Sequence, residues 1–221
     1  GIYLYSFTYL PETRNAKTIT KVNMFSVLKR LVMDPTVMAF SLVLGGCNGI
    51  IFSYYGETPF IYMEYFKITP GIYGALGVVV AFGLIAGALY SKRNVESYGA
   101  QRTIFKGCMI ILVASALLMG LVLFGTTPSI LCMATFLSVV FVLFIGIGMT
   151  IPNCLSLALV KFQDVLGTAS SLFGMTYYII ISLITWGMSL IHNDSLLTMP
   201  LYFVGISAMM LMVCRRFVIS K

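Results

Sequence analysis

Long runs of apolar residues, separated by short polar segments, make up most of this chain. The runs do not alternate between apolar and polar positions as the strands of a membrane barrel do, and they reach about the 20 residues that cross a bilayer as a helix. The pattern predicts an all-α membrane protein, a six-transmembrane-helix bundle over residues 36–214. Its predicted spans are residues 36–60, 72–90, 104–124, 129–151, 168–190 and 199–214.

The chain begins with an apolar stub and a polar segment ahead of the first predicted span. Residues 1–10 are too few to cross a bilayer, so we interpret them as the tail of a truncated transmembrane helix whose beginning is missing. Residues 11–35 are predicted to form a hinge loop, in which Met24–Met33 has the pattern of a short amphipathic helix at the membrane surface. Further polar segments are predicted to be loops at residues 91–102 and 152–167, and a tail at residues 215–221.

The charged residues predict how the chain is oriented in the membrane. Only 10% of the 221 residues are charged and 59% are hydrophobic, whereas soluble domains carry about 25% charged residues. Of the 14 Lys and Arg residues, all but Lys67 lie in or next to the hinge loop, the two polar loops and the tail, on one side of the predicted bundle. Because basic loops stay in the cytoplasm, the hinge loop and the C-terminus are predicted to be cytoplasmic. The net charge of +7 is therefore a topology signal and indicates no nucleic-acid partner.

Residue types that support catalysis or metal binding are scarce. The five cysteines stand singly, without the spacing of a metal site or a disulfide framework, and the one histidine, His192, lies near the end of a span. An intramembrane enzyme needs a base or metal ligands within the membrane, and a channel needs a filter-like loop or a ring of charges. The sequence therefore predicts no enzyme, no channel, and no cofactor or metal site.

The end of the first predicted span has an unusual composition for a segment that only sits in lipid. Residues 54–66 combine six aromatic rings with Glu57, Glu64, Gly56 and Pro59. A carboxylate near hydrocarbon is costly, so a functional role is the default hypothesis for Glu57. Gly56 and Pro59 beside it weaken the helix, and broken helices of this kind are tolerated where they line a cavity. The alternative is that the helix simply ends here, with both acids in the outer headgroup region.

A candidate substrate cavity follows from side-chain spacing in two spans. Asn48, Phe52 and Tyr55 have i, i+4, i+7 spacing, so one helical face carries an amide, a ring and a phenol. Together with Glu57 and with Tyr178 of the fifth predicted span, they offer an aromatic cavity with a few polar anchors. The alternatives are that the rings face lipid or the core, and that Asn48 makes an interhelical hydrogen bond.

Small residues suggest where helices pack closely or move. Gly83 and Gly87 have the four-residue spacing that lets helix backbones approach each other. Gly148, Pro152 and Asn153 give the fourth predicted span a kinkable end. Packing alone explains both groups, and the alternative is that these helices slide or rock during function.

Short motifs along the chain resemble those of a known group of transporters. Leu10-Pro11-Glu12-Thr13 ahead of a basic hinge resembles the middle of a twelve-span transporter of the major facilitator superfamily. Residues 92–102 resemble a degenerate copy of the short basic loop of that superfamily, which makes Arg93 and Arg102 candidate gating residues. The motifs that resemble the Bcr/CflA-type drug-resistance family within it are Thr58–Glu64, Ile68–Pro70, Tyr73-Gly74, Pro152-Asn153 and Gly167–Leu172.

This resemblance implies a fold of two six-helix bundles with a substrate cavity between them, of which the chain is the C-terminal half. It also implies export of drug-like or amphipathic small molecules across the inner membrane of a bacterium by proton antiport. The partners would be the substrate, protons, the lipid bilayer and the missing N-terminal six-helix half. Two alternatives are a major facilitator carrier of another small metabolite and an inactive half-transporter fragment.

Overall fold

The computed structural model of the protein describes residues 23–124, 127–193 and 195–219. Within these residues the chain is all-helical and has no β-strand, and six helices are long and apolar enough to cross a membrane. The predicted fold class, an all-α membrane protein with six such helices, is confirmed. The predicted stub at residues 1–10 and the first part of the hinge loop lie outside the described residues.

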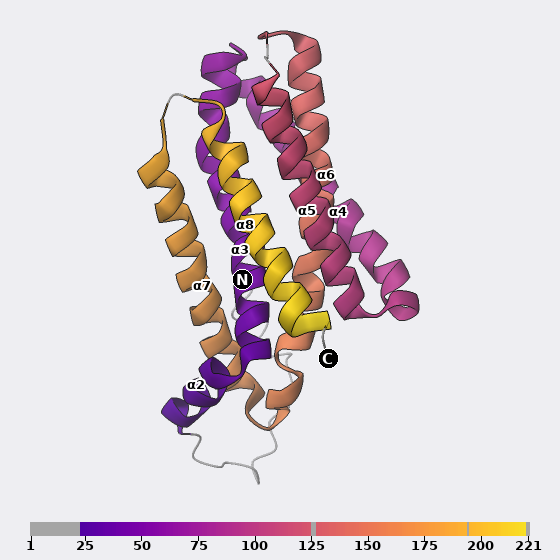
Figure 1. The fold of residues 1–221 in the computed structure, drawn as a ribbon, viewed down its shortest axis with the longest axis vertical. Helices are drawn as coiled ribbons and strands as arrows, with labels where there is room; N and C mark the ends of the chain where they lie inside the picture. Colours follow the sequence, from indigo (N-terminus) through magenta and orange to yellow (C-terminus); the bar gives the residue numbers. More distant parts are fainter. Residues whose placement is uncertain (1–22, 125–126, 194, 220–221) are drawn as a thin grey trace, which may run out of the picture.

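Seven α-helices and three short helical segments make up the described chain (Figure 1). The α-helices are α2 (Met24–Met33), α3 (Pro35–Pro59), α4 (Pro70–Tyr98), α5 (Ala100–Leu123), α6 (Ile130–Ala158), α7 (Leu166–Ile191) and α8 (Thr198–Cys214). A π-helix, η2 (Phe60–Tyr65), continues α3, a 3-10 helix, η3 (Val160–Val165), leads into α7, and a π-helix, η4 (Arg215–Ile219), follows α8.

Two helices extend beyond the spans expected for them. Helix α4 continues through most of the expected polar loop to Tyr98, and only Gly99, at φ 79°, separates it from α5. Helix α6 continues past Pro152 to Ala158. The expected loops were placed where polarity begins, but the Lys, Arg and Glu residues that continue α4 are good helix formers. Polarity alone therefore does not mark the end of α4.

The six long helices form two layers. Helices α7, α3, α6 and α4 follow one another in the first layer, because α3 packs on α6 and α7, and α4 packs on α6. Helices α8 and α5 form the second layer, where α8 packs on α3 and α5, and α5 packs on α6. Helix α3 is the most buried of the six, and the edge helices α4 and α7 are the least buried. Among the described residues, no helix covers the other broad side of the first layer.

Glycines allow the backbones of α4 and α6 to approach each other closely. A Cβ atom on Gly83 would lie 2.9 Å from the carbonyl oxygen of Phe141, and one on Gly87 would overlap the carbonyl of Ile145. From the other side, a Cβ atom on Gly148 would overlap the carbonyl of Leu84. The backbones of the two helices thus touch directly, as the spacing of Gly83 and Gly87 predicted.

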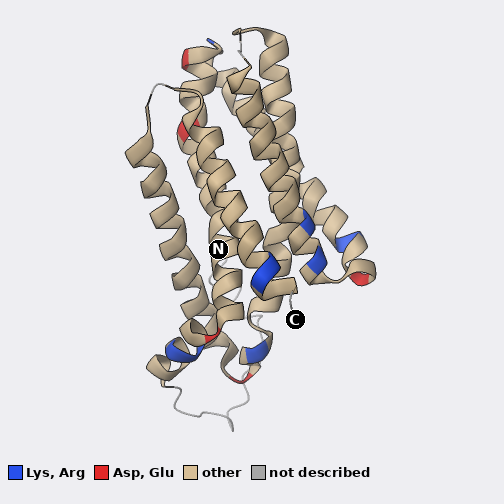
Figure 2. Cartoon of the chain, viewed as in Figure 1, with Lys and Arg blue, Asp and Glu red and all other residues tan. Residues whose placement is uncertain are grey.

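The basic residues gather toward one end of the bundle, formed by α2, the junction of α4 and α5, η3 and η4, and called here the basic end (Figure 2). Helix α2 lies across this end with Val27 and Leu31 buried, and its bounds are those predicted from the sequence. Arg30 bonds Asp164 at 3.2 Å, and its guanidinium lies 5.1 Å from the ring centre of Phe162. The surface helix is thereby fastened to the connection between α6 and α7.

Asp34 joins three elements at the same end. Its carboxylate accepts hydrogen bonds from the N–H groups of Thr36 and Val37, which caps α3, and from Nζ of Lys161 at 2.7 Å. Partial burial opposes ionisation of Asp34, but the bonds from Lys161 and the two N–H groups outweigh it and lower the pKa of this carboxyl.

We expect Gly87→Ala to destabilise the protein by about 1–3 kcal/mol, because the added methyl group meets backbone atoms of α6 that cannot move aside. Gly77→Ala is the matched control on the same helix, since a Cβ atom there meets nothing within 4 Å. Alanine is the better helix former, so the control should keep or raise the melting temperature in detergent. Equal melting temperatures for the two variants would contradict the close contact of α4 and α6.

We also expect acid to remove the stabilisation that Asp34 provides. Because its folded-state pKa is lowered, this stabilisation is complete above the ordinary aspartate pKa of about 3.9 and is lost as the pH falls through the lower, folded-state value. At pH 7, Asp34→Ala should lower the free energy of unfolding by about 1 kcal/mol, because the helix cap is lost. In a series of melting curves at decreasing pH, the difference between the variant and the unchanged protein should vanish at the acid end. Asp164→Asn, which alters an exposed ion pair, should change the curves far less.

Candidate functional site

Helix α3 presents three faces to neighbouring helices. Gly45 and Gly49 face α7, where a Cβ atom would come within 2.6 Å and 2.7 Å of Ile180 and Ile184. Gly46 faces Met210 of α8. The Tyr54 ring meets Phe144 of α6 edge-on, with 5.2 Å between the ring centres. Three sides of this helix are therefore closed by protein.

The fourth face of α3, which no described helix covers, carries three of the predicted site residues. Since successive helical residues turn by about 100°, Asn48, Phe52 and Tyr55 share the face that points away from α6, α7 and α8. The Phe52 and Tyr55 side chains are 53% and 45% exposed in this chain, and Asn48 is half-buried. The amide of Asn48 donates to the carbonyl of Leu44 within α3, at 3.0 Å, and not to another helix. The structure thus brings together the amide, the ring and the phenol. We call this group the open face of α3.

Tyr178 lies exposed on α7 and stacks on Tyr177, with 4.8 Å between the ring centres. It borders a shallow hollow of about 470 Å³ that α7 alone lines, with Trp186 at the far end. Tyr178 is therefore accessible from outside the chain but shares no hollow with the open face of α3 among the described pockets.

Glu57, like Tyr178, lies apart from the open face of α3. Its carboxylate points toward the end of α7, where its two oxygens lie 2.8 Å and 3.0 Å from Nδ1 of His192. The pair borders a pocket of about 240 Å³ that also includes Phe60 and Glu64. Sequence reasoning left His192 without a role. Its position at the outer end of the fifth predicted span, on the same side as Glu57, was the signal that could have paired them.

The helix is not interrupted at Gly56 and Pro59, although these residues were expected to break it. It widens into η2, whose wider turn accommodates the missing N–H of Pro59. Thr58 then ties the segment to α4 through a 3.0 Å hydrogen bond with the hydroxyl of Tyr73. A Cβ atom on Gly56 would meet nothing within 4 Å, so this position stays open beside the uncovered face.

The other candidate gating residues lie at or near the basic end. Arg93 and Arg102 are exposed on either side of the junction of α4 and α5. Pro152 is exposed inside α6, and Asn153 is buried next to it. The amide of Asn153 donates to the hydroxyl of Ser91 at 2.6 Å and to the carbonyl of Met149 at 2.7 Å. Asn153 is thus a buried polar link between α6 and α4, which its type and position alone did not reveal.

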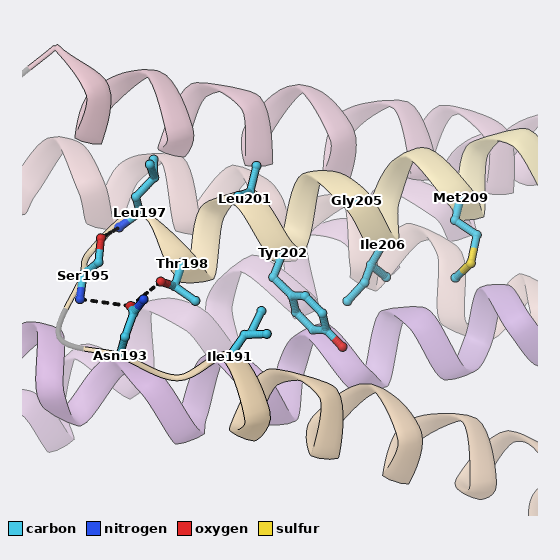
Figure 3. A pocket seen from close by; sticks show the side chains of 10 residues that line it. All are labelled: Ile191, Asn193, Ser195, Leu197, Thr198, Leu201, Tyr202, Gly205, Ile206 and Met209. Carbon is cyan, nitrogen blue, oxygen red and sulfur yellow. Dashed lines mark hydrogen bonds between the residues drawn. The ribbon is translucent and has the colours of Figure 1, made fainter.

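A groove of about 600 Å³ runs between α7 and α8 (Figure 3). Its wall is apolar apart from a rim of Asn193, Ser195 and Thr198, and the hydroxyl of Tyr202 donates to the carbonyl of Ile184 at 2.8 Å. Helix α8 packs on the side of α3 that Gly46 occupies, so the groove lies away from the open face. Among the described residues, no group of three or more His, Cys, Asp or Glu side chains is placed to hold a metal ion.

Comparison with known proteins finds similar transporters, although no protein-family model matches the chain. An "Uncharacterized transporter" of Rickettsia bellii is 29% identical over 210 residues, which cover 90% of this chain and 50% of that protein. One of the same description from Rickettsia felis is 29% identical over 199 residues, covering 86% of this chain and 48% of that protein. The "Uncharacterized MFS-type transporter YdgK" of Bacillus subtilis is 27% identical over 145 residues, covering 66% of this chain and 35% of that protein.

The chain spans about half the length of the two Rickettsia relatives that it matches. Six apolar helices and these relatives indicate a multi-pass membrane protein and support a transporter in general, with one relative of the MFS type. The narrower resemblance to the Bcr/CflA-type family stays a prediction.

Proposed function

We propose that this chain is the C-terminal half of a major facilitator transporter that exports drug-like or amphipathic small molecules in exchange for protons. The open face of α3 carries this proposal. Helix α3 is closed by protein on three sides, yet its fourth side exposes a phenyl ring, a phenol and an amide. Such a mixture of rings and few polar groups is typical of pockets for drug-sized ligands.

A second six-helix half would cover this face and complete the cavity. The uncovered first layer and the length of the Rickettsia relatives, about twice that of this chain, both support such a partner. In the whole protein, Tyr178 and Trp186 on α7 would lie at the edge of the same interface, with substrate held between the two halves.

The proposed location is the cytoplasmic (inner) membrane of a bacterium. The basic end of the bundle carries nine of the described Lys and Arg residues, namely Lys29, Arg30, Lys92, Arg93, Arg102, Lys106, Lys161, Arg215 and Arg216, whereas Lys67 follows η2 at the opposite end. By the positive-inside rule the basic end, and with it the C-terminus, faces the cytoplasm. Glu57 and His192 then lie toward the outer side.

A carrier of another small metabolite is the second candidate function. The amide of Asn48 and the phenol of Tyr55 both form hydrogen bonds, and a site built to bond a hydroxyl group discriminates strongly for it. Substrate profiles separate the two candidates, because an exporter of amphipathic compounds tolerates loss of a hydroxyl group and a metabolite carrier does not.

The test is transport by the complete reading frame that contains this chain, in bacteria that lack their own efflux pumps. Phe52→Ala and Tyr55→Ala should slow efflux of a fluorescent amphipathic dye about tenfold, which corresponds to about 1.4 kcal/mol of lost contact energy. Leu117→Ala is the matched control, because Leu117 is 54% exposed on α5 of the second layer. Protein levels in the membrane must be equal across the variants.

Two results would contradict the proposal. One is efflux by the Phe52 and Tyr55 variants at the rate of the unchanged protein. The other is an equal loss of efflux in the Leu117 variant, since that residue lies away from the proposed cavity. Efflux that persists when the proton gradient is collapsed would contradict the proton-exchange part of the proposal and leave the cavity part standing.

A further inference from the structure

Glu57 and His192 join two segments that are 135 residues apart in the sequence. Glu57 lies in the last turns of α3, and His192 follows the last residue of α7. The imidazole Nδ1 lies within hydrogen-bonding distance of both carboxylate oxygens, at 2.8 Å and 3.0 Å. The carboxylate side chain is only 14% exposed and the imidazole 36%. The contact is therefore partly shielded from water.

The surroundings leave the imidazole as the local source of positive charge. The pocket that the pair borders includes the titratable groups Glu64 and Tyr65 of η2 beside Glu57, and no Lys or Arg is among its described lining residues. Phe60 covers one side of the imidazole, with 5.1 Å between the ring centres. The imidazole thus shares this pocket with two carboxylates, those of Glu57 and Glu64.

This contact also fastens the connection between α7 and α8 to α3. The other side-chain hydrogen bonds of the described part of that connection are internal, since Asn193 accepts from Ser195 and Thr198, and Ser195 accepts from Leu197 (Figure 3). Farther along, α7 meets α3 through apolar contacts at Gly45 and Gly49. Within the described chain, the end of α7 is thus held to α3 by one polar contact that a single proton can change.

We propose that Glu57 and His192 form a proton-operated latch at the end of the bundle opposite the basic end. The latch is closed when an imidazolium meets a carboxylate, because a hydrogen bond between two charged groups is about twice as strong as a neutral one. It is weakened when His192 loses its proton or when Glu57 gains one, because either change removes one of the two charges. Opening frees the end of α7 and uncovers the small pocket. The latch requires no particular substrate and stands apart from the proposed export function.

The test measures the distance between the end of α7 and the start of α4 in the complete protein in lipid nanodiscs. Spin labels at Leu190→Cys and Ile72→Cys, which are exposed positions, report this distance by pulsed electron paramagnetic resonance. Cys132→Ser removes the one cysteine that is not buried. We expect one narrow distance population at pH 6 and a second population at pH 8 that is at least twofold larger than at pH 6.

Charge-fixed variants separate the latch from other pH effects. His192→Gln and Glu57→Gln keep hydrogen-bonding side chains without the charge pair, so both should show the second population at either pH. His192→Lys keeps a positive charge and should stay closed at pH 8. Glu64→Gln is the matched control, because Glu64 borders the same pocket without a described bond to His192, and it should retain the pH response.

A pH response that survives in His192→Gln and in Glu57→Gln would overturn the latch, as would the absence of any response in the unchanged protein. Agreement of the two Gln variants with each other guards against misfolding of one of them, and their helix content by circular dichroism should equal that of the unchanged protein. Loss of dye efflux in a variant whose distances follow the latch would leave this inference intact.

Discussion

Close backbone contact at glycines is the constraint on which the rest of this bundle depends. In a membrane, lipid is as apolar as leucine, so helices associate through packing and not through exclusion of water. Gly45, Gly46 and Gly49 let α7 and α8 approach α3, and Gly87 and Gly148 join α4 to α6. The glycine contacts close two faces of α3, and Tyr54 against Phe144 of α6 closes a third. The accessible ring, phenol and amide lie on the fourth face.

The two ends of the bundle are fastened by different chemistry. At the basic end, Asp34 pairs with Lys161 and Asp164 pairs with Arg30. At the opposite end, the corresponding contact between α3 and α7 uses a histidine. The ion pairs at the basic end thus use Lys and Arg, and the contact at the opposite end uses the histidine on which the proposed latch depends.

The features that could be predicted from the sequence are those that depend on one helix at a time. Long apolar runs predict spanning helices, and fixed spacing places Asn48, Phe52 and Tyr55 on one face whatever the neighbours are. Helix ends were harder, because α4 and α6 continue into water where polarity alone suggests a loop. The pairs Glu57–His192 and Asn153–Ser91 could not be read from spacing, since each depends on how two helices far apart in the sequence are aligned.

The most direct test of a substrate cavity on α3 is the accessibility of single cysteines in the complete protein, measured in membranes with a water-soluble maleimide. Cysteines at Asn48, Phe52 and Tyr55 should react, and a transported compound should protect them. The native Cys47 and a cysteine at Ser53 are buried and should stay unreactive. If cysteines at Phe52 and Tyr55 react only with a lipid-soluble maleimide, the open face of α3 is turned to lipid and the account of a cavity there is contradicted.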